Sequence, residues 1–295
     1  MDTIDKGFKQ QKQTQLKRIM SGFYRWLASD IDPPRAIPLS DFERISYEVR
    51  IGDVLLIEGR TRISRIIRAV TLSPWTHAVL YIGRLANIED PKLYALAKAS
   101  YSGNESDQLI LETVLGKGTV ISPLSIYKRE HIRICRPRAL ARKDAINILA
   151  FSLKRLGSEY NVRHILDLAR FLFPWGLLPK RWRSSLFNHN ADVPTKQICS
   201  AMIAEAFYSV RFPILPLIHK QPDGKIELIP RNTRLYTPSD FDYSPYFEII
   251  KYPFFELSER TVYHDLPWNQ DGVISDDDAG LYIPPNKVNS SEPEL

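Results

Sequence analysis

The sequence predicts a mixed α+β protein built from short strands and amphipathic helices. Short apolar runs bounded by polar or turn residues recur along the chain, which is typical of buried strands. Longer stretches repeat their apolar residues every three to four positions, which is typical of helices with one buried face. We therefore expect one body in which strands and helices pack together, and we see no internal repeat.

Five runs are expected to form strands and three stretches to form helices. The strands are predicted at residues 53–58, 77–83, 108–113, 131–136 and 246–252. The helices are predicted at residues 63–71, 141–156 and 197–210. The first of these helices is short and basic, and the last is expected to end before Pro213.

The composition limits the classes of protein to which the chain can belong. The chain has 295 residues, 44% of them hydrophobic and 11% aromatic, which is enough for a sizeable core and argues against disorder throughout. Two cysteines exclude a disulfide scaffold and a four-cysteine zinc module. No run approaches the roughly 18 apolar residues of a membrane span. The N-terminus lacks the pattern of a signal peptide, so we expect a cytoplasmic location.

Charge is distributed unevenly. Residues 1–35 carry a net +3, residues 36–255 a net +10 and residues 256–295 a net −7, which together give +6. A basic body suits phosphate-bearing partners such as membrane headgroups or nucleic acid, and it also suits solubility alone. Because no helix-turn-helix, zinc-finger or RNA-recognition motif is present, nucleic acid is not the expected partner.

The sequence indicates three regions. Residues 1–38 are expected to form a basic amphipathic helix, spanning 8–28, and a proline linker. This helix would either lie on an anionic membrane surface, at the inner face of the membrane, or dock on its own protein. Residues 39–255 form the expected main domain. Residues 256–295 are acidic and are expected to form a flexible, solvated tail.

Two stretches are interpreted as insertions in the main domain. Residues 84–107 are small and polar and are expected to form a surface excursion between two strands. Residues 163–194 contain an apolar segment, 166–179, followed by basic residues. Such a segment fits an interfacial element or a lid, and it equally fits a packed subdomain.

The two cysteines lie in different contexts. Cys199 comes directly before an apolar-periodic helix, where the helix dipole and free backbone N–H groups favour a thiolate. The same N–H groups suit a developing oxyanion. A buried, inert cysteine is the alternative at this position. Cys135 lies in the middle of a predicted strand and is expected to be an inert core residue.

His77 and Glu112 complete the candidate site. His77 begins a predicted strand after a turn, a place where an imidazole can meet a thiol at the edge of a sheet. Glu112 lies in an apolar strand, where an unpaired carboxylate would be costly, and a hydrogen bond to the second nitrogen of His77 would stabilise it. Structural roles for both residues, such as an edge-facing glutamate, remain open from these patterns alone.

Taken in order, several blocks resemble a known family, the circularly permuted branch of the NlpC/P60 superfamily, which comprises YiiX/YaeF-type papain-like cysteine hydrolases. The similar blocks run from about residue 50 to 252, with histidine first and cysteine last. They are Gly52–Leu56, Trp75–Gly83, Leu111–Glu112 with Gly118–Val120, Ile198–Ser200, Thr237–Phe241 and Ser244–Phe247.

The resemblance implies a permuted papain-like fold, a small and mostly antiparallel sheet or barrel packed against helices that carry the cysteine. It also implies acyl transfer through a cysteine thioester, with Cys199 as nucleophile, His77 as base and then acid, and Glu112 orienting His77. No metal or organic cofactor is expected.

This chain departs from the family pattern at two points. Glu112 follows His77 by 35 residues, a longer separation than the family leads us to expect, because of the 84–107 excursion. Ala201 stands where an acidic residue commonly follows the Cys-Ser pair. The long separation bears on the placement of Glu112, whereas neither departure touches Cys199 or His77.

The substrate is inferred from context. Apolar residues with basic neighbours before Cys199, an arginine-rich helix before His77 and a basic N-terminus all fit a lipid or acylated substrate at an anionic membrane surface. One alternative is a peptide or peptidoglycan-type amidase of the same fold. Another is a non-catalytic membrane-associated module. The sequence does not indicate the oligomeric state.

Overall fold

The structure is a computed structural model that describes residues 22, 24–31, 39–158 and 199–254, together with the backbone of residues 273–274 and 282–283. The chain divides into two units, residues 1–254 and 255–295. In the second unit, β9 (Val273–Ile274) pairs antiparallel with β10 (Tyr282–Ile283).

Several predicted regions lie outside the described residues. They are most of the predicted helix 8–28, the proline linker, the 163–194 insertion with its apolar segment, and most of the acidic 256–295 region.

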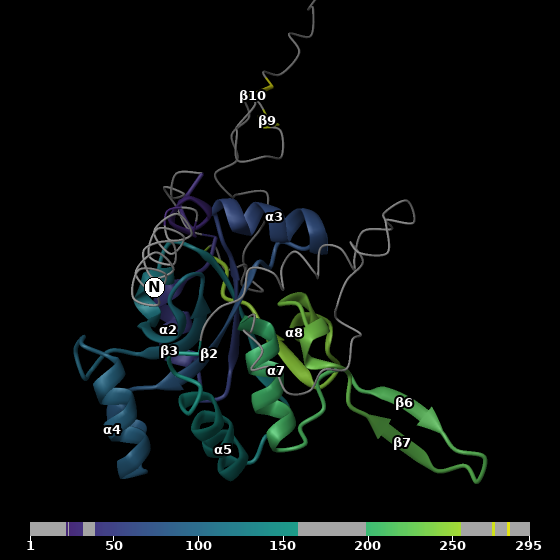
Figure 1. Cartoon of the computed structure of the whole chain (residues 1–295). Coiled ribbons are helices and arrows are strands. Elements are labelled where there is room, and N and C mark those ends of the chain that lie inside the picture. The colour runs from purple at the N-terminus through teal and green to yellow at the C-terminus, as the bar shows by residue number, and fades with distance from the viewer. Residues whose placement is uncertain are drawn as a thin grey trace, which may run out of the picture. The chain divides into compact units, whose positions relative to one another are not determined.

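A six-stranded antiparallel sheet forms the centre of the first unit (Figure 1), in the order β4-β3-β2-β1-β5-β8. All five predicted strands lie in it. Their bounds are β1 Val54–Glu58, β2 His77–Gly83, β3 Leu109–Val114, β5 His131–Pro137 and β8 Phe247–Ile250. The sixth strand, β4 (Gly118–Pro123), follows β3 through a tight turn that contains Gly116 at φ +78. The α+β class with a mostly antiparallel sheet is confirmed.

Helices cover both faces of this sheet. On one face, α5 (Arg142–Leu153) packs against α7 (Cys199–Ser209), which lies on β2 and β3. The α7 residues Met202, Ile203 and Phe207 are fully buried there. The other face is covered by α2 (Phe42–Glu48), whose Ile45 packs against Leu55 and Ile57 of β1. Since α7 is apolar almost all round, it is a core helix that fixes its own first residue, Cys199, against the sheet.

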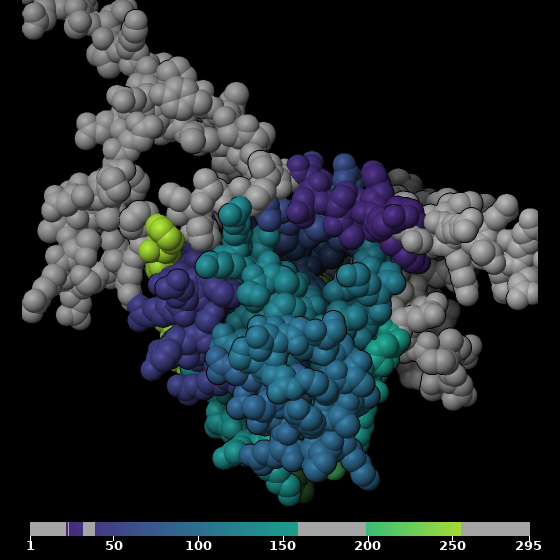
Figure 2. All heavy atoms as spheres, turned by 90° about the vertical axis from the view of Figure 1, so that its left-hand side faces the viewer, coloured from purple at the N-terminus to yellow at the C-terminus, as the bar shows by residue number. Residues whose placement is uncertain are grey.

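The 84–107 stretch, expected to be a polar surface excursion, contains two helices. It contains the short helix η1 (Leu85–Asn87) and α4 (Pro91–Ser100), which begins with an Asp90 cap on the Lys92 and Leu93 N–H groups. Leu85, Leu93 and Ala97 are buried in the core. The atoms of α4 are the blue ones at the lower centre of Figure 2. The stretch therefore contributes to the core as well as to the surface.

The chain between α7 and β8 carries smaller elements. A hairpin of β6 (Leu217–Lys220) and β7 (Ile226–Ile229) extends from the body, and every residue of both strands is exposed (Figure 1). The short helices η4 (Thr233–Leu235) and α8 (Ser239–Tyr243) then lead into β8. The remaining elements are α3 (Arg62–Thr71), between β1 and β2, and η2 (Leu124–Tyr127), after β4.

Candidate active site

Cys199 is the first residue of α7 and is buried, with 4% of its surface exposed. The first N–H groups of a helix have no intrahelical partner and carry the positive end of the dipole. Two backbone N–H groups, those of Ala78 and Ser200, hydrogen-bond the sulfur. The predicted position of Cys199 at a helix start is therefore the position that the structure gives it.

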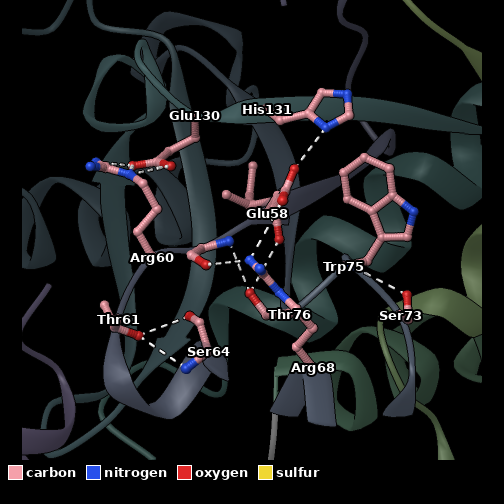
Figure 3. Close-up of polar contacts among 12 residues, drawn as sticks. Glu58, Arg60, Thr61, Ser64, Arg68, Ser73, Trp75, Thr76, Glu130 and His131 are labelled. Carbon is pink, nitrogen blue, oxygen red and sulfur yellow. Dashed lines mark hydrogen bonds and ion pairs between the residues drawn. The ribbon is translucent and has the colours of Figure 1, made fainter. Parts of the chain in front are cut away.

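His77 is held by the segment that leads into β2. Thr76 donates its backbone N–H to the Ile57 carbonyl at 3.1 Å, and its hydroxyl accepts from the Gly59 N–H at 2.9 Å. The Trp75 N–H bonds the Ser73 hydroxyl at 3.2 Å (Figure 3). These bonds fix the backbone on the N-terminal side of His77, so that its side chain starts from a rigid edge of the sheet.

Glu112 reaches His77 through the register of the sheet. Leu80 pairs with Leu111 and Tyr81 with Ile110, which puts His77 and Glu112 on the same face and diagonally adjacent. The His77 Nε2 lies 2.8 Å from the Glu112 Oε2. Because strand pairing sets this contact, the 35-residue separation does not displace Glu112 from the site.

The structure thus brings together Cys199, His77 and Glu112. His77 also hydrogen-bonds the Cys199 side chain. Since Nε2 is engaged by Glu112, Nδ1 is the ring nitrogen left to face the thiol. The imidazole lies between a sulfur and a carboxylate, which is the arrangement of a nucleophile, its base and an orienting acid.

The electrostatics favour a thiolate. Burial opposes ionisation of Cys199, yet the charge of His77, its hydrogen bond and the Ala78 and Ser200 N–H groups together lower the pKa of Cys199. Burial likewise opposes the charged form of His77, but Cys199 and then Glu112 raise the pKa of His77 above its ordinary value. The two shifts point to a thiolate–imidazolium pair.

Tyr127 is a further member of the site that the sequence reasoning missed. Its hydroxyl donates to the Glu112 Oε2 at 2.6 Å, and its ring lies 6.1 Å from the His77 ring. Glu112 is buried, which disfavours its charge, but bonds from His77, Ser122 and Tyr127 keep its pKa below the usual value. No local motif marks Tyr127, because it reaches Glu112 only through the fold.

A charged cluster lies at the same end of the sheet (Figure 3). The Glu58 carboxylate binds the His131 Nδ1 at 3.0 Å and the Arg68 Nη2 at 3.5 Å. Arg60 forms a two-pronged pair with Glu130, with its shortest contact at 2.6 Å. These contacts join β1, α3 and β5 just behind the loop that carries His77.

Trp75 lies beside this cluster and is buried, at 2% exposed. Its ring is 5.0 Å from the His131 ring and 4.6 Å from the Arg133 guanidinium carbon. The loop before His77 is therefore held by its side chains as well as by its backbone.

Two arginines of α3 contact other parts of the same chain. Arg68 bonds Glu58 and the Gly59 carbonyl, and the Arg62 guanidinium lies over the Trp26 ring at 5.1 Å. The chain at 24–31 docks beside it: Leu27 is 4% exposed and the Ile31 N–H bonds the Arg60 carbonyl at 3.1 Å. These residues, in purple, lie along the upper edge of the face in Figure 2. For residues 24–31, docking on the protein is the arrangement found.

Cys135 lies on β5 with none of its surface exposed, and burial raises the pKa of its thiol. It is a core residue, as predicted.

Within the described part of the chain, no three His, Cys, Asp or Glu side chains gather in a way that would hold a metal ion. Over the same residues, no helix combines the length and apolarity needed to cross a membrane.

Comparison with known proteins does not assign this chain to a family. No family model matches the chain, and no curated protein matches it. Among solved structures, it is similar to metalloprotein yiiX from Escherichia coli O157:H7 (DUF1105), at 11% identity and a TM-score of 0.42, over 69% of this chain and 97% of that one. This is a weak likeness, and the α+β class is shown by the chain's own sheet and helices.

Proposed function

We propose that this protein is a cysteine hydrolase or acyltransferase with a permuted papain-like fold, acting through a thioester on Cys199. The observation that supports this most directly is the contact of His77 with both Cys199 and Glu112, at the start of a core helix. A cysteine with a purely structural role does not require an imidazole beside it, two N–H donors to its sulfur and a carboxylate that orients the imidazole. The combination is the one that activates a thiol for nucleophilic attack.

The proposed reaction has two halves. The Cys199 thiolate attacks a carbonyl carbon, and the resulting oxyanion is stabilised by N–H groups at the start of α7. The intermediate collapses to a thioester as the protonated His77 gives its proton to the leaving amine, alcohol or thiol. Water or another acceptor then attacks the thioester, His77 takes its proton, and the acid or acylated acceptor leaves with Cys199 restored.

We infer an acyl amide, ester or thioester, from a lipid or acylated molecule, as the substrate class. Apolar side chains in and directly after α3, the helix leading to His77, support this: Ile66, on the helix, is 43% exposed, and Leu72, which follows its last residue, is 89% exposed. Exposed apolar residues on the segment that leads to His77 suit an acyl chain better than a polar peptide. A peripheral place at the inner face of an anionic membrane follows as part of the same proposal. A peptide or peptidoglycan-type amidase is the runner-up.

Thiol alkylation tests the proposed function. Iodoacetamide labelling of the wild type is followed across pH 5–9, with the labelled cysteine identified by mass spectrometry. We expect Cys199 to react well below pH 8.5, the ordinary thiol pKa, and His77→Ala to abolish this low-pH reactivity. Cys135→Ser is the matched control and should leave the profile unchanged, because Cys135 is buried and its pKa is raised.

Turnover is then measured with acyl thioesters, esters and peptide amides in turn. Cys199→Ser should lose at least 1000-fold in rate, an order-of-magnitude figure for removing a nucleophile, with little change in melting temperature. A Cys199 that labels no faster than a free thiol, in a protein that turns over none of these substrates, would favour a non-catalytic module.

A further inference from the structure

A cavity of ≈ 490 Å³ lies at the end of the sheet opposite His77. Its walls come from the residues before β1, the end of β5 and the start of α5. The side chain of Ile51, one of the lining residues, lies against Gly83, the last residue of β2. Since His77 is the first residue of that strand, the cavity is roughly 20 Å from the candidate active site, at about 3.3 Å per residue.

Arg136 forms a fixed cationic wall of the cavity. Its Nε bonds the Asp53 Oδ1 at 3.1 Å, and its Nη2 bonds both the Asp53 Oδ2 at 2.8 Å and the Glu48 carbonyl at 2.7 Å. Asp53 is itself buried and accepts from the Arg50 N–H at 2.9 Å. Three bonds of this kind hold the plane of the guanidinium in one orientation.

One edge of that guanidinium is left open. Nη1 of Arg136 forms no hydrogen bond within the described part of the chain, and it is not among the buried polar atoms that lack a partner there. It is therefore accessible, in a residue that lines the cavity. A pre-oriented pair of N–H donors with an accessible edge is what an anion requires.

Exposed arginines at the rim add further positive charge. Arg50, Arg138 and Arg142 also line the cavity and are exposed. Arg142 pairs with Glu89 at 2.8 Å, but both are so exposed, 83% and 69%, that the pair holds weakly. Arg50 and Arg138 form no ion pair with any residue that the structure describes.

The acidic residues that line the cavity do not fully neutralise its arginines. Of the three acidic residues in the walls, Asp53 and Glu89 are engaged by Arg136 and Arg142, and Glu248 remains. Against four arginines the formal charge of the walls is +1. Ile51, Leu140 and Ile146 give the same walls an apolar part. The ligand that fits is an anion attached to an apolar group.

We propose that this cavity binds the phosphate of a phosphomonoester that carries an apolar group, between the fixed Arg136 and the exposed Arg50 and Arg138. A phosphate offers three terminal oxygens and nearly two negative charges, which matches several guanidinium donors better than a carboxylate does. A soluble phosphomonoester and a lipid phosphate headgroup share this chemistry. The proposal is independent of the proposed acyl-transfer activity.

The test is calorimetric titration of the full chain with inorganic phosphate, against sodium chloride at equal ionic strength. The variant is Arg50→Ala combined with Arg138→Ala, and Arg129→Ala is the matched control, because Arg129 is an exposed arginine just before β5, at the other end of that strand. We expect saturable binding that weakens about tenfold or more in the double variant, since each lost charge-assisted bond is a large part of such an affinity. Melting temperatures without phosphate show that each variant is folded.

Phosphatidylcholine vesicles with and without phosphatidic acid separate the two sources. If binding to the phosphatidic acid vesicles falls in the double variant and is competed by inorganic phosphate, the source is a lipid headgroup. If phosphate binds and the vesicles do not, the source is soluble. Either result supports the site. Phosphate binding that is absent, or that is equal in the wild type and the double variant, overturns the proposal.

Discussion

At the residue scale, the two bonds that Glu112 Oε2 accepts have different consequences. The His77 Nε2 lies 2.8 Å away and the Tyr127 hydroxyl 2.6 Å away. The first bond orients the imidazole directly. The second holds the carboxylate that does so, which makes Tyr127 a positioning residue in the proposed mechanism.

Tyr127→Phe should therefore keep the ring beside His77 and remove one donor from Glu112. We expect kcat/KM to fall by about 3- to 10-fold, which is less than the full value of a hydrogen bond to a charged group, because Tyr127 acts on the reaction only through Glu112. The lost donor was lowering the Glu112 pKa, so that pKa rises and the acid limb of the pH–rate profile moves to higher pH. A profile that keeps its acid limb in place would show that the tyrosine is only packing.

Glu112→Gln acts at the other limb of the profile. Glu112 is one of the groups that raise the His77 pKa, and the thiolate–imidazolium pair persists only while His77 is protonated. Loss of the carboxylate lowers the His77 pKa, and the alkaline limb should move to lower pH. We expect a smaller rate loss than in His77→Ala, which removes the acid and base altogether. An equal loss in both variants would assign Glu112 a direct chemical role.

At the element scale, the 84–107 stretch shows why a local pattern can mislead. Its small and polar residues predict a surface excursion, yet α4 buries Leu93 and Ala97 beside the sheet. The residues of α4 are largely apolar, with Leu93 and Leu96 among several alanines, but polar and small residues on either side of the helix dominate the composition of the whole 84–107 stretch. The excursion thus supports the core without entering the site.

Leu93→Ala should lower the free energy of unfolding by about 2–4 kcal/mol, the usual result of emptying a buried leucine site. Leu96→Ala, on the same helix but 37% exposed, is the matched control and should cost less than about 1 kcal/mol. Urea unfolding measures both, and the pH profile of Cys199 alkylation should be the same in both variants and the wild type. Equal destabilisation by the two changes would contradict a core role for α4.

At the scale of the whole molecule, the parts that the sequence predicts are those with long, regular patterns. The strands β1, β2 and β3 are buried along nearly their whole length and are apolar runs in the sequence, and α7 begins where Cys199 suggests a helix start. Tyr127 and the Arg136–Asp53 pair could not be predicted, because their partners are brought to them by strand register and by the packing of distant segments. The β6–β7 hairpin is not among the predicted elements, although apolar residues on either side of Asp223-Gly224 are a local signal for a hairpin.

Membrane contact is a property of the whole molecule. Because residues 24–31 dock on the body, a deletion that tests membrane contact must end before them. The segment is tied down through Leu27 and the Ile31–Arg60 bond, so a truncation that removes it would disturb the body. Residues 1–21 carry five Lys or Arg and two Asp, and near an anionic surface each basic residue contributes about 1 kcal/mol. Deleting residues 1–21 should therefore separate membrane affinity from stability.

In a flotation assay with phosphatidylserine vesicles, we expect this deletion to lower the bound fraction while turnover of a soluble acyl ester and the melting temperature stay unchanged. Deleting residues 1–31 should lower the melting temperature as well, because Leu27 loses its buried site. Vesicle binding that survives the shorter deletion, and that is insensitive to salt, would mean that the basic N-terminus makes no membrane contact. The proposed acylated substrate would then have to reach Cys199 from solution.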